Sequence, residues 1–448
     1  MTAVRMTEGS IAGHLWRYAL PLVLTNLFQL TYNAVDSAIV GRMISADALA
    51  AVSASSPVMN LLVLAISGLC VGTGVMISEA FGAGDEQGVR RALGTMLLCG
   101  VGVSVLVALG GIALMRPLLR LLAVPSSIAE QAGRYLSVAL TGVPVVCCYN
   151  ALASAAKSVG DARTPLRVLI CSSVMNAALD VLAVAWLRLG VVSTAMTTVL
   201  SQLFSVVLLR VLIRRRLPVL RMERGDWRLD RAMLGRMLSY GGTAALQQAC
   251  QPIGKLMIQR AVNTLGVEAM ACFGAVGRVD DYACLPAQSI AAASTTLLAQ
   301  NRGAHQYGRL RSGFVTAMLM ELSWWPVIGL VTLLFRVPIM RVFIAQGDAA
   351  SITEGCAYLA WMALFYLLPC MTNGCQGFFR GMGRMRVTLM GTLIQITLRV
   401  VFVYVLVPTM GLSGVAIASA IGWVCMLAAQ APLIVRALRD MKAAGVRS

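Results

Sequence analysis

Charged residues are scarce in this chain of 448 residues. Asp, Glu, Lys and Arg make up 12% of it, whereas soluble globular domains carry roughly 25%. Hydrophobic residues make up 58% of the chain, and its mean hydropathy is +0.78. This balance excludes a soluble enzyme and indicates that most of the chain lies in lipid.

The residues on which most enzymes and metalloproteins depend are also few. The two histidines, His14 and His305, lie at or beyond the ends of apolar segments and have no metal-type partner at helical spacing. The Gly-Lys pair at 254–255 lacks the neighbours of a phosphate-binding loop, which argues against ATP hydrolysis. The 12 cysteines form no CxxC pair, so we interpret them as buried apolar residues. We therefore expect no enzymatic activity and no cofactor.

Long apolar segments, by contrast, recur along the whole chain. A transmembrane helix needs about 20 mostly apolar residues. Twelve segments meet this requirement: 17–40, 50–77, 93–115, 135–156, 166–187, 190–213, 237–261, 269–298, 313–335, 356–379, 387–407 and 412–435. The first is longer than a signal-peptide core and lacks a cleavage motif, so we expect it to be retained. Because a backbone in lipid must satisfy its own hydrogen bonds, the sequence predicts an all-α membrane protein with twelve transmembrane helices.

The distribution of basic residues predicts the orientation of these helices. Most of the 37 Lys and Arg residues fall on one side of the predicted membrane, above all in the segment 214–231 (RRRLPVLRMERGDWRLDR). Lys and Arg accumulate in cytoplasmic loops. We therefore predict that both termini lie in the cytoplasm, and the net charge of +18 gives no indication of nucleic-acid binding.

A weak internal repeat divides the chain into halves. DALA at 47–50 aligns with EAMA at 268–271, and at nearly the same offset Lys157 aligns with Arg380. Each half has six spans, so both enter the membrane in the same direction. This predicts two six-helix lobes related by a pseudo-two-fold axis along the membrane normal. The predicted parts are an amino lobe (1–213), a basic cytoplasmic linker (214–231), a carboxy lobe (232–436) and a cytoplasmic tail (437–448).

A few carboxylates fall inside the apolar segments, where each costs roughly 2.5–3.5 kcal/mol on insertion scales. Asp36 and Asp180 lie about 9 and 12 Å below the outer ends of the first and fifth spans, at ~1.5 Å per residue. Asn176 and Tyr32 lie one turn from these acids, and the sixth span adds the oxygens of Thr194, Thr197, Thr198, Ser201 and Gln202. Such a site suits a shared proton or a bound Na⁺. In the alternative interpretation, each Asp only hydrogen-bonds a neighbouring helix.

The second half does not repeat this site, because the position that matches Asp180 holds Val403. We therefore expect ion binding in the amino half only. The carboxy half has its own charged residues within or near spans: Lys255, Arg278, Asp280, Asp281, Glu321 and Arg399. Two interpretations stay open, a structural charge network and direct contacts with substrate.

Four segments carry a more specific signal: YALPLVLTNLFQLTYNAVDSAIVGR (18–42), DALAAV (47–52), SEAFGAGD (78–85) and LLAQNRGA (297–304). With these motifs and its two six-span halves, the chain resembles the multidrug and toxic compound extrusion (MATE) family of secondary transporters over nearly its whole length. The resemblance implies two lobes that exchange Na⁺ or H⁺ for organic, often cationic, compounds by alternating access.

The resemblance also implies a cation site in the amino lobe, formed by Asp36, Asn176, Asp180 and Thr198. If Na⁺ is the coupling ion, Asp36, Asn176 and Asp180 would be its ligands. Another branch of the family carries acids on the seventh and tenth spans. Here the seventh span offers Lys255 and the tenth, 356–379, has no carboxylate, so the chain resembles the branch with the amino-lobe site.

We therefore predict an antiporter of the bacterial inner membrane that exports amphipathic, cationic small molecules in exchange for Na⁺ or H⁺. We expect a monomer surrounded by membrane lipid. The alternative is a flippase of lipid-linked precursors from the same superfold. Such a flippase needs a strongly basic cavity, for which Lys255, Arg278 and Arg399 are the candidates.

Overall fold

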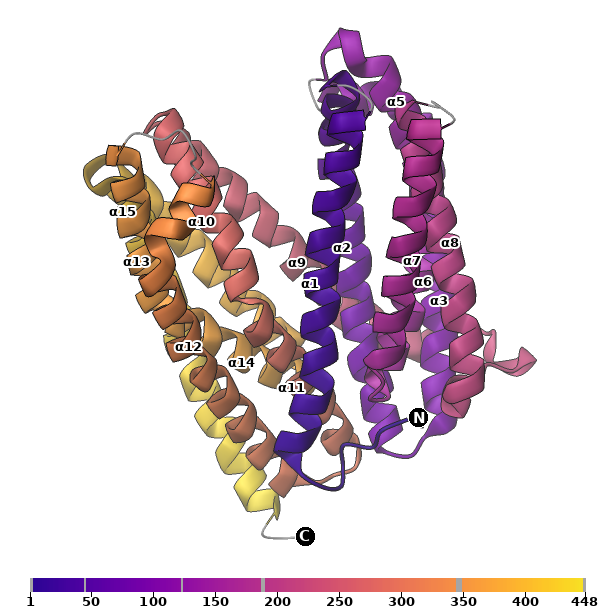
Figure 1. The fold of residues 1–448 in the computed structure, drawn as a ribbon. Helices are drawn as coiled ribbons and strands as arrows, with labels where there is room; N and C mark the ends of the chain where they lie inside the picture. Colours follow the sequence, from indigo (N-terminus) through magenta and orange to yellow (C-terminus); the bar gives the residue numbers. More distant parts are fainter. Residues whose placement is uncertain (1–2, 44–45, 122–123, 187–189, 344–348, 446–448) are drawn as a thin grey trace. The chain divides into compact units, whose positions relative to one another are not determined.

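The structure, a computed structural model, describes residues 3–43, 46–121, 124–186, 190–343 and 349–445. Within these ranges the side chains of 33–43, 46–49, 51, 121, 185–186, 343, 349–351 and 443–445 are not described. The described residues form helices joined by short turns, with no strand among them (Figure 1).

Residue contacts divide the chain into two compact units. The first unit comprises Met1–Arg5 and Leu24–Ala245. Its helices are α2 (Ala46–Gly82), α3 (Glu86–Ala113), α4 (Met115–Leu121), α5 (Ser126–Thr141), α6 (Val143–Ser158), α7 (Arg163–Val181), the π-helical η1 (Leu182–Trp186), α8 (Val191–Arg216), and the short 3₁₀ helices η2 (Pro218–Leu220) and η3 (Arg224–Asp226).

The second unit comprises Met6–Val23 and Leu246–Ser448. Its helices are α10 (Val267–Ala283), α11 (Leu285–Gly303), α12 (Tyr307–Phe343), α13 (Ala349–Phe365), α14 (Leu367–Gly381) and α15 (Met385–Gly445). Two helices, α1 (Ile11–Met43) and α9 (Arg231–Asn263), contribute one part to each unit. The first part of α1 belongs to the second unit, and the first part of α9 belongs to the first unit. The lobes predicted from the sequence assign these two parts the other way round.

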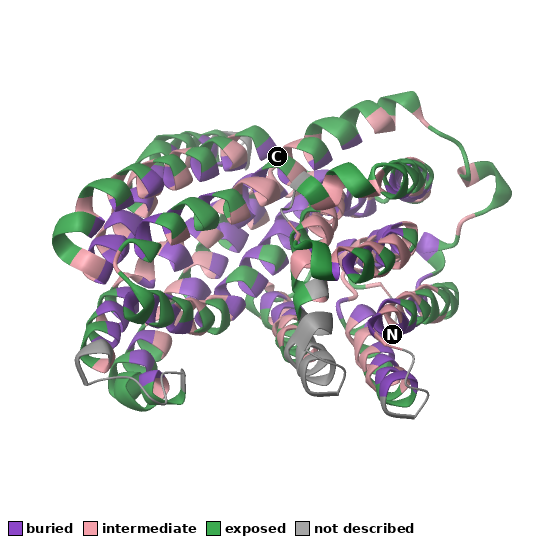
Figure 2. Ribbon diagram, turned by 90° about the horizontal axis from the view of Figure 1, so that it is seen from above, coloured by how far each residue is buried: buried purple, intermediate pink, exposed green. Residues whose placement is uncertain are grey.

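Each unit has its own apolar core. In the first, Ile77, Leu93 and Leu209 are fully buried between α2, α3 and α8, and in the second, Leu359 and Val403 join α13 to α15. Figure 2 shows most helices with one buried and one exposed face. The exposed faces are apolar too, since Leu106 is 70% and Leu334 67% exposed. A surface of this kind is stable against lipid rather than water.

As far as the structure describes them, the twelve predicted spans fall on helices, although several are bent or interrupted. Six described helices are long and apolar enough to cross a membrane, and up to eight spans result if two bent pairs are each counted as one. The bent pairs are α5 with α6, at 40°, and α13 with α14, at 43°. They form the fourth span of each half, so the repeat extends to the shape of its helices.

Two glycines separate consecutive predicted spans. Gly190 precedes α8 with φ of 73°. Within α15, Gly411 has φ of 58° and ψ of −139°, so two helices meet there. Residues with a Cβ rarely adopt such positive φ values. These glycines therefore separate the fifth span from the sixth and the eleventh from the twelfth.

Candidate functional site

The predicted residues of α7 occupy one buried face of that helix. Asn176 is 1% exposed and Asp180 is 0% exposed. Side chains four residues apart lie on the same face of a helix, and α8 packs against α7. The π-helical turn η1 begins shortly after Asp180, and such turns often occur at functional sites.

Asp180 is held by polar side chains from both helices. The Thr197 hydroxyl donates to Asp180 Oδ1 in a short hydrogen bond. The side-chain amide of Asn176 satisfies both its oxygen and its nitrogen in one of its two orientations. In that orientation its nitrogen donates to Asp180 Oδ2 over 3.1 Å, and its oxygen accepts from the backbone N–H of Thr198 over 3.3 Å. The Tyr32 hydroxyl hydrogen-bonds the same amide over 2.5 Å. Tyr32 of α1 thus joins Asn176 and Asp180 of α7 in one chain of contacts.

The other predicted members of the site have different positions. The Thr198 hydroxyl donates to the Thr194 carbonyl oxygen of its own helix over 2.8 Å, so only its backbone contacts Asn176. The side chain of Asp36 lies outside the described residues, and its place in the site stays a prediction. Among the described residues no group of three His, Cys, Asp or Glu side chains could hold a metal ion.

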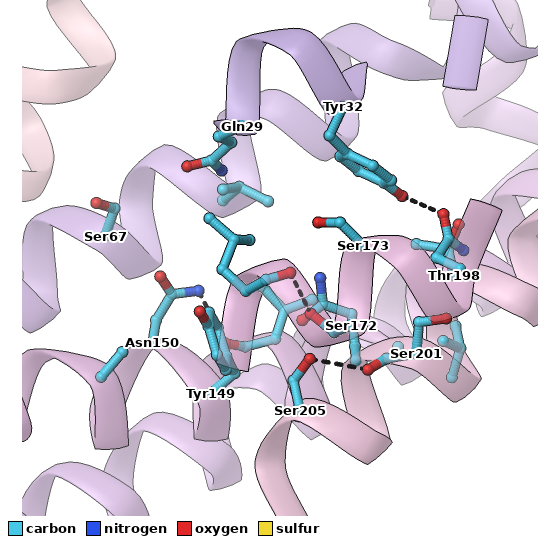
Figure 3. Close-up of a pocket in the computed structure, with 18 of the residues that line it drawn as sticks. Gln29, Tyr32, Ser67, Tyr149, Asn150, Ser172, Ser173, Thr198, Ser201 and Ser205 are labelled. Carbon is cyan, nitrogen blue, oxygen red and sulfur yellow. Dashed lines mark hydrogen bonds between the residues drawn. The ribbon is translucent and has the colours of Figure 1, made fainter. Parts of the chain in front are cut away.

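A cavity of about 480 Å³ adjoins this cluster in the first unit. Many of the residues that line it are polar, as Figure 3 shows. Asn176 lines it but Asp180 does not, so the amide lies between the carboxylate and the cavity. The polar lining consists of Thr25, Gln29, Tyr32, Asn60, Ser67, Tyr135, Tyr149, Asn150, Ser154, Lys157, Ser172, Ser173, Asn176, Thr198, Ser201, Gln202 and Ser205.

Two features of this wall suit it to a polar ligand. The Ser201 hydroxyl and the side-chain amide oxygen of Gln202 are buried without a hydrogen-bond partner, and such atoms are rare unless water or a ligand satisfies them. Among the described residues, Lys157 is the charged residue that lines the cavity. No described carboxylate does so.

Sequence reasoning missed part of this arrangement. It gave Thr197 no special role, although this is the residue that bonds Asp180. It treated Asn150 and Lys157 only as markers of the repeat. Their spacing of seven residues, two helical turns, puts them on one face of α6 and was the available signal.

The charged residues predicted in the second unit do not form one compact site. Asp280 accepts a hydrogen bond from the Tyr366 hydroxyl over 2.6 Å. In the part of the chain that the structure describes, neither Lys255 nor Arg399 forms an ion pair with it within 4.0 Å. Arg278 and Asp281 are exposed on the same helix as Asp280.

A buried polar cluster in the second unit was not predicted. Gln247 Nε2 donates to Gln376 Oε1 over 2.5 Å and to Thr392 Oγ1 over 2.8 Å. The Arg380 guanidinium donates to Gln247 Oε1 over 3.3 Å. Arg380 matches Lys157 in the internal repeat, so each half carries a cation at the end of its fourth span.

Comparisons with known proteins identify the family. The sequence model of the MatE family matches residues 21–182 and again residues 244–405. The chain belongs to the MatE family. The two matches begin at Pro21 and Ala244, and this is the same offset that aligns Lys157 with Arg380. Each half of this MatE protein therefore corresponds to one family unit.

Other MatE-type proteins resemble the chain over most of its length. It is 28% identical to the probable multidrug resistance protein YpnP of Bacillus subtilis (strain 168) over 397 residues, 88% of each chain. It is 27% identical to the probable multidrug resistance protein YoeA of the same organism, over 78% of each chain. A solved outward-facing structure of a multidrug resistance MATE family transporter superposes with a TM-score of 0.90, 22% identity and 99% coverage of both chains.

These comparisons confirm the predicted family and fold class, an all-α membrane protein with the twelve-helix, two-lobe architecture of MATE transporters. They point to a transporter. The coupling ion, the substrates and the residues that bind them are matters for proposal.

Proposed function

We propose that this MatE protein exports amphipathic organic compounds, cationic ones in particular, in exchange for Na⁺ or H⁺. It would work by alternating access in a bacterial inner membrane, with both termini in the cytoplasm. The family and the multidrug resistance proteins among its relatives support export of varied small molecules.

The observation that carries this proposal is the buried Asp180 beside the polar cavity. A carboxylate at 0% exposure inside a membrane helix is costly unless it is paired or serves ion transfer. Thr197 and Asn176 hold the carboxyl group by hydrogen bonds. A proton or Na⁺ would neutralise it, with Asn176, Asp180 and the predicted Asp36 as oxygen ligands in the case of Na⁺.

Coupling follows if the ion changes the cavity wall. Asn176 bonds both Asp180 and Tyr32, and Tyr32 lines the cavity. Binding of a cation at Asp180 would reorient this amide and so alter the wall that a substrate contacts. An ion drives transport only if it binds the two conformations with different affinity, and the Asn176 amide gives a structural route for that difference.

The flippase alternative receives less support from the cavity. Lipid-linked precursors carry phosphate groups, and a site for them needs several cations. Among the described residues Lys157 is the basic residue that lines the cavity. One lysine among hydroxyls and amides fits small organic molecules better than a pyrophosphate-linked lipid.

The test is efflux of the cationic dye ethidium from a pump-deficient bacterium, with Na⁺ and pH gradients imposed separately. We expect one gradient to drive efflux by the natural protein, and Asp180→Asn and Asp36→Asn to lose this response. Asp440→Asn, which removes an exposed carboxylate from the end of α15, is the control and should respond normally. Gradient-driven efflux that survives in both site variants would refute the assignment.

A further inference from the structure

The second unit contains an acid that the proposed mechanism does not use. Glu321 lies on α12, one of the helices long and apolar enough to cross a membrane. It is 0% exposed, and neither of its carboxyl oxygens has a side-chain hydrogen-bond partner. The backbone N–H of Gly374 is the polar group that approaches it. Buried polar groups are almost always bonded, so this acid is an exception with a high energetic cost.

The surroundings of Glu321 offer little that would compensate a negative charge. Its carboxyl group packs on Gly374 of α14, where an added Cβ would lie 3.2 Å from Glu321 Oε2 and 2.9 Å from Met318 Cε. The titratable groups that face it are the thiols of Cys370 and Cys375, also on α14. Among the described residues, α10, α11, α13 and α15 direct no charged group towards it.

The surroundings of Glu321 determine which cation can bind its carboxyl group. An ionised carboxylate without a partner in an apolar interior would cost far more than a lost hydrogen bond, whereas a protonated one carries no charge. Na⁺ would need several oxygen ligands, and the glycine, the methionine and the two thiols supply no side-chain oxygen. The chemistry of this pocket therefore selects a proton.

We propose that Glu321 is a proton-binding site of the second unit, loaded in this conformation and unloaded in another during the transport cycle. This inference rests on the proposed transport function and deepens it. The halves differ at the position that matches Asp180, which led us to expect ion binding in the amino half only; Glu321 would add a second site on a different span.

The bend between α13 and α14 gives this site a route to a second state. α14 begins directly after the 43° break, and Gly374 lies within its second turn. A change in this bend would move Gly374 away from the carboxyl group and admit water. Protonation and bending would then favour each other, which is the differential affinity that coupling requires.

Infrared spectroscopy of the purified full-length protein tests the proton itself. A protonated carboxylic acid has a carbonyl stretching band above the amide bands, and an ionised one does not. We expect this band at neutral pH in the natural protein and in the control Glu354→Gln, an exposed glutamate of α13. The Glu321→Gln variant should lack the component due to Glu321. An unchanged band in Glu321→Gln would overturn the proposal.

Transport in proteoliposomes tests whether the proton cycles. Glu321→Gln should bind ethidium normally, yet its transport driven by a pH gradient should fall about tenfold or more. Glu321→Asp, which keeps an acid but shortens it, should retain the infrared band and part of the transport. Transport by Glu321→Gln at the rate of the natural protein would refute the claim that Glu321 binds and releases a proton during transport. If the natural protein moves no ethidium, the proposed function fails. The infrared experiment still tests Glu321 in that case, because a carboxylic acid band that disappears reversibly at high pH shows that Glu321 exchanges a proton.

Discussion

At the residue scale, the site depends on which of two adjacent threonines faces α7. Neighbouring residues on a helix point about 100° apart, so Thr197 and Thr198 cannot serve the same partner. The Thr197 hydroxyl reaches Asp180 as well as the Ser193 and Thr194 carbonyl oxygens of its own helix. The Thr198 hydroxyl bonds its own helix, and only its backbone approaches Asn176. This makes Thr197 the threonine whose side chain should affect the ion.

We predict that Thr197→Val changes the affinity of Asp180 for its ion, because the hydroxyl that stabilises the ionised carboxylate is lost. A hydrogen bond to a charged group is worth about 1.5–3 kcal/mol, so the Na⁺ or H⁺ concentration for half-maximal transport should change roughly tenfold or more. Thr194→Val is the matched control, because Thr194 is buried on the same helix and its hydroxyl donates to the Val191 carbonyl oxygen. An equal effect of both substitutions would mean that Asp180 does not depend on Thr197.

Lys157 should bias the charge of the transported molecules. It lines the cavity as a cation, without a described carboxylate in the lining. We expect Lys157→Gln to raise transport of cationic dyes relative to anionic dyes several-fold. Arg167→Gln, which removes an exposed cation from α7, should leave this ratio unchanged. The ratio measured in one vesicle preparation loaded with both dyes is the readout, and no change in Lys157→Gln would exclude a contact with substrate.

At the scale of elements, small residues let helices approach closely. Within the first unit, Gly68 of α2 faces Ala245 of α9, and Gly72 faces Gly241. On each helix the two small residues are four positions apart. An added Cβ at Gly72 would lie 2.3 Å from the Gly241 backbone nitrogen. Such small-residue stripes permit backbone contact between membrane helices, and this explains why the first part of α9 belongs to the first unit.

We predict that Gly72→Ala lowers the thermal stability of the detergent-solubilised protein. Overpacking of a close contact costs about 1–3 kcal/mol, because neither backbone can move without loss of packing. Gly110→Ala is the control. Gly110 lies on α3, and its added Cβ would meet nothing within 4 Å. There the substitution should be neutral or stabilise by roughly 0.5–1 kcal/mol. Equal melting temperatures of the two variants would contradict the close contact.

At the scale of the whole molecule, the basic residues predict how the chain crosses the membrane. The segment 214–231 carries a concentration of arginines, and its described part contains only the short helices η2 and η3 between α8 and α9. A short basic loop of this kind stays on the cytoplasmic side. Even numbers of spans before and after it would then put both termini there as well.

Fusions to a reporter that fluoresces only in the cytoplasm test this topology. Reporters after Ser448 and within the segment 214–231 should fluoresce. A fusion truncated after Gly266, in the turn between α9 and α10, should be dark although it is present in the membrane. Fluorescence from the Gly266 fusion would reverse the predicted orientation of the second half.

The sequence by itself determined the class of the protein, its spans and its repeat. Hydropathy along the chain is a local property, and lipid leaves the backbone no stable alternative to helices. Within the described residues, the twelve predicted spans accordingly fall on helices. The offset between the halves, which aligns Lys157 with Arg380, was also readable, and the family matches recover it.

Only the tertiary structure decided which side chains meet. Thr197 rather than Thr198 bonds Asp180, because the rotation of α8 against α7 is set by packing along both helices. Lys157 lines a cavity and Glu321 is buried without a side-chain partner for the same reason, since each depends on residues far away in the sequence. Helical periodicity gives the face on which a residue lies, but packing between helices determines what that face contacts.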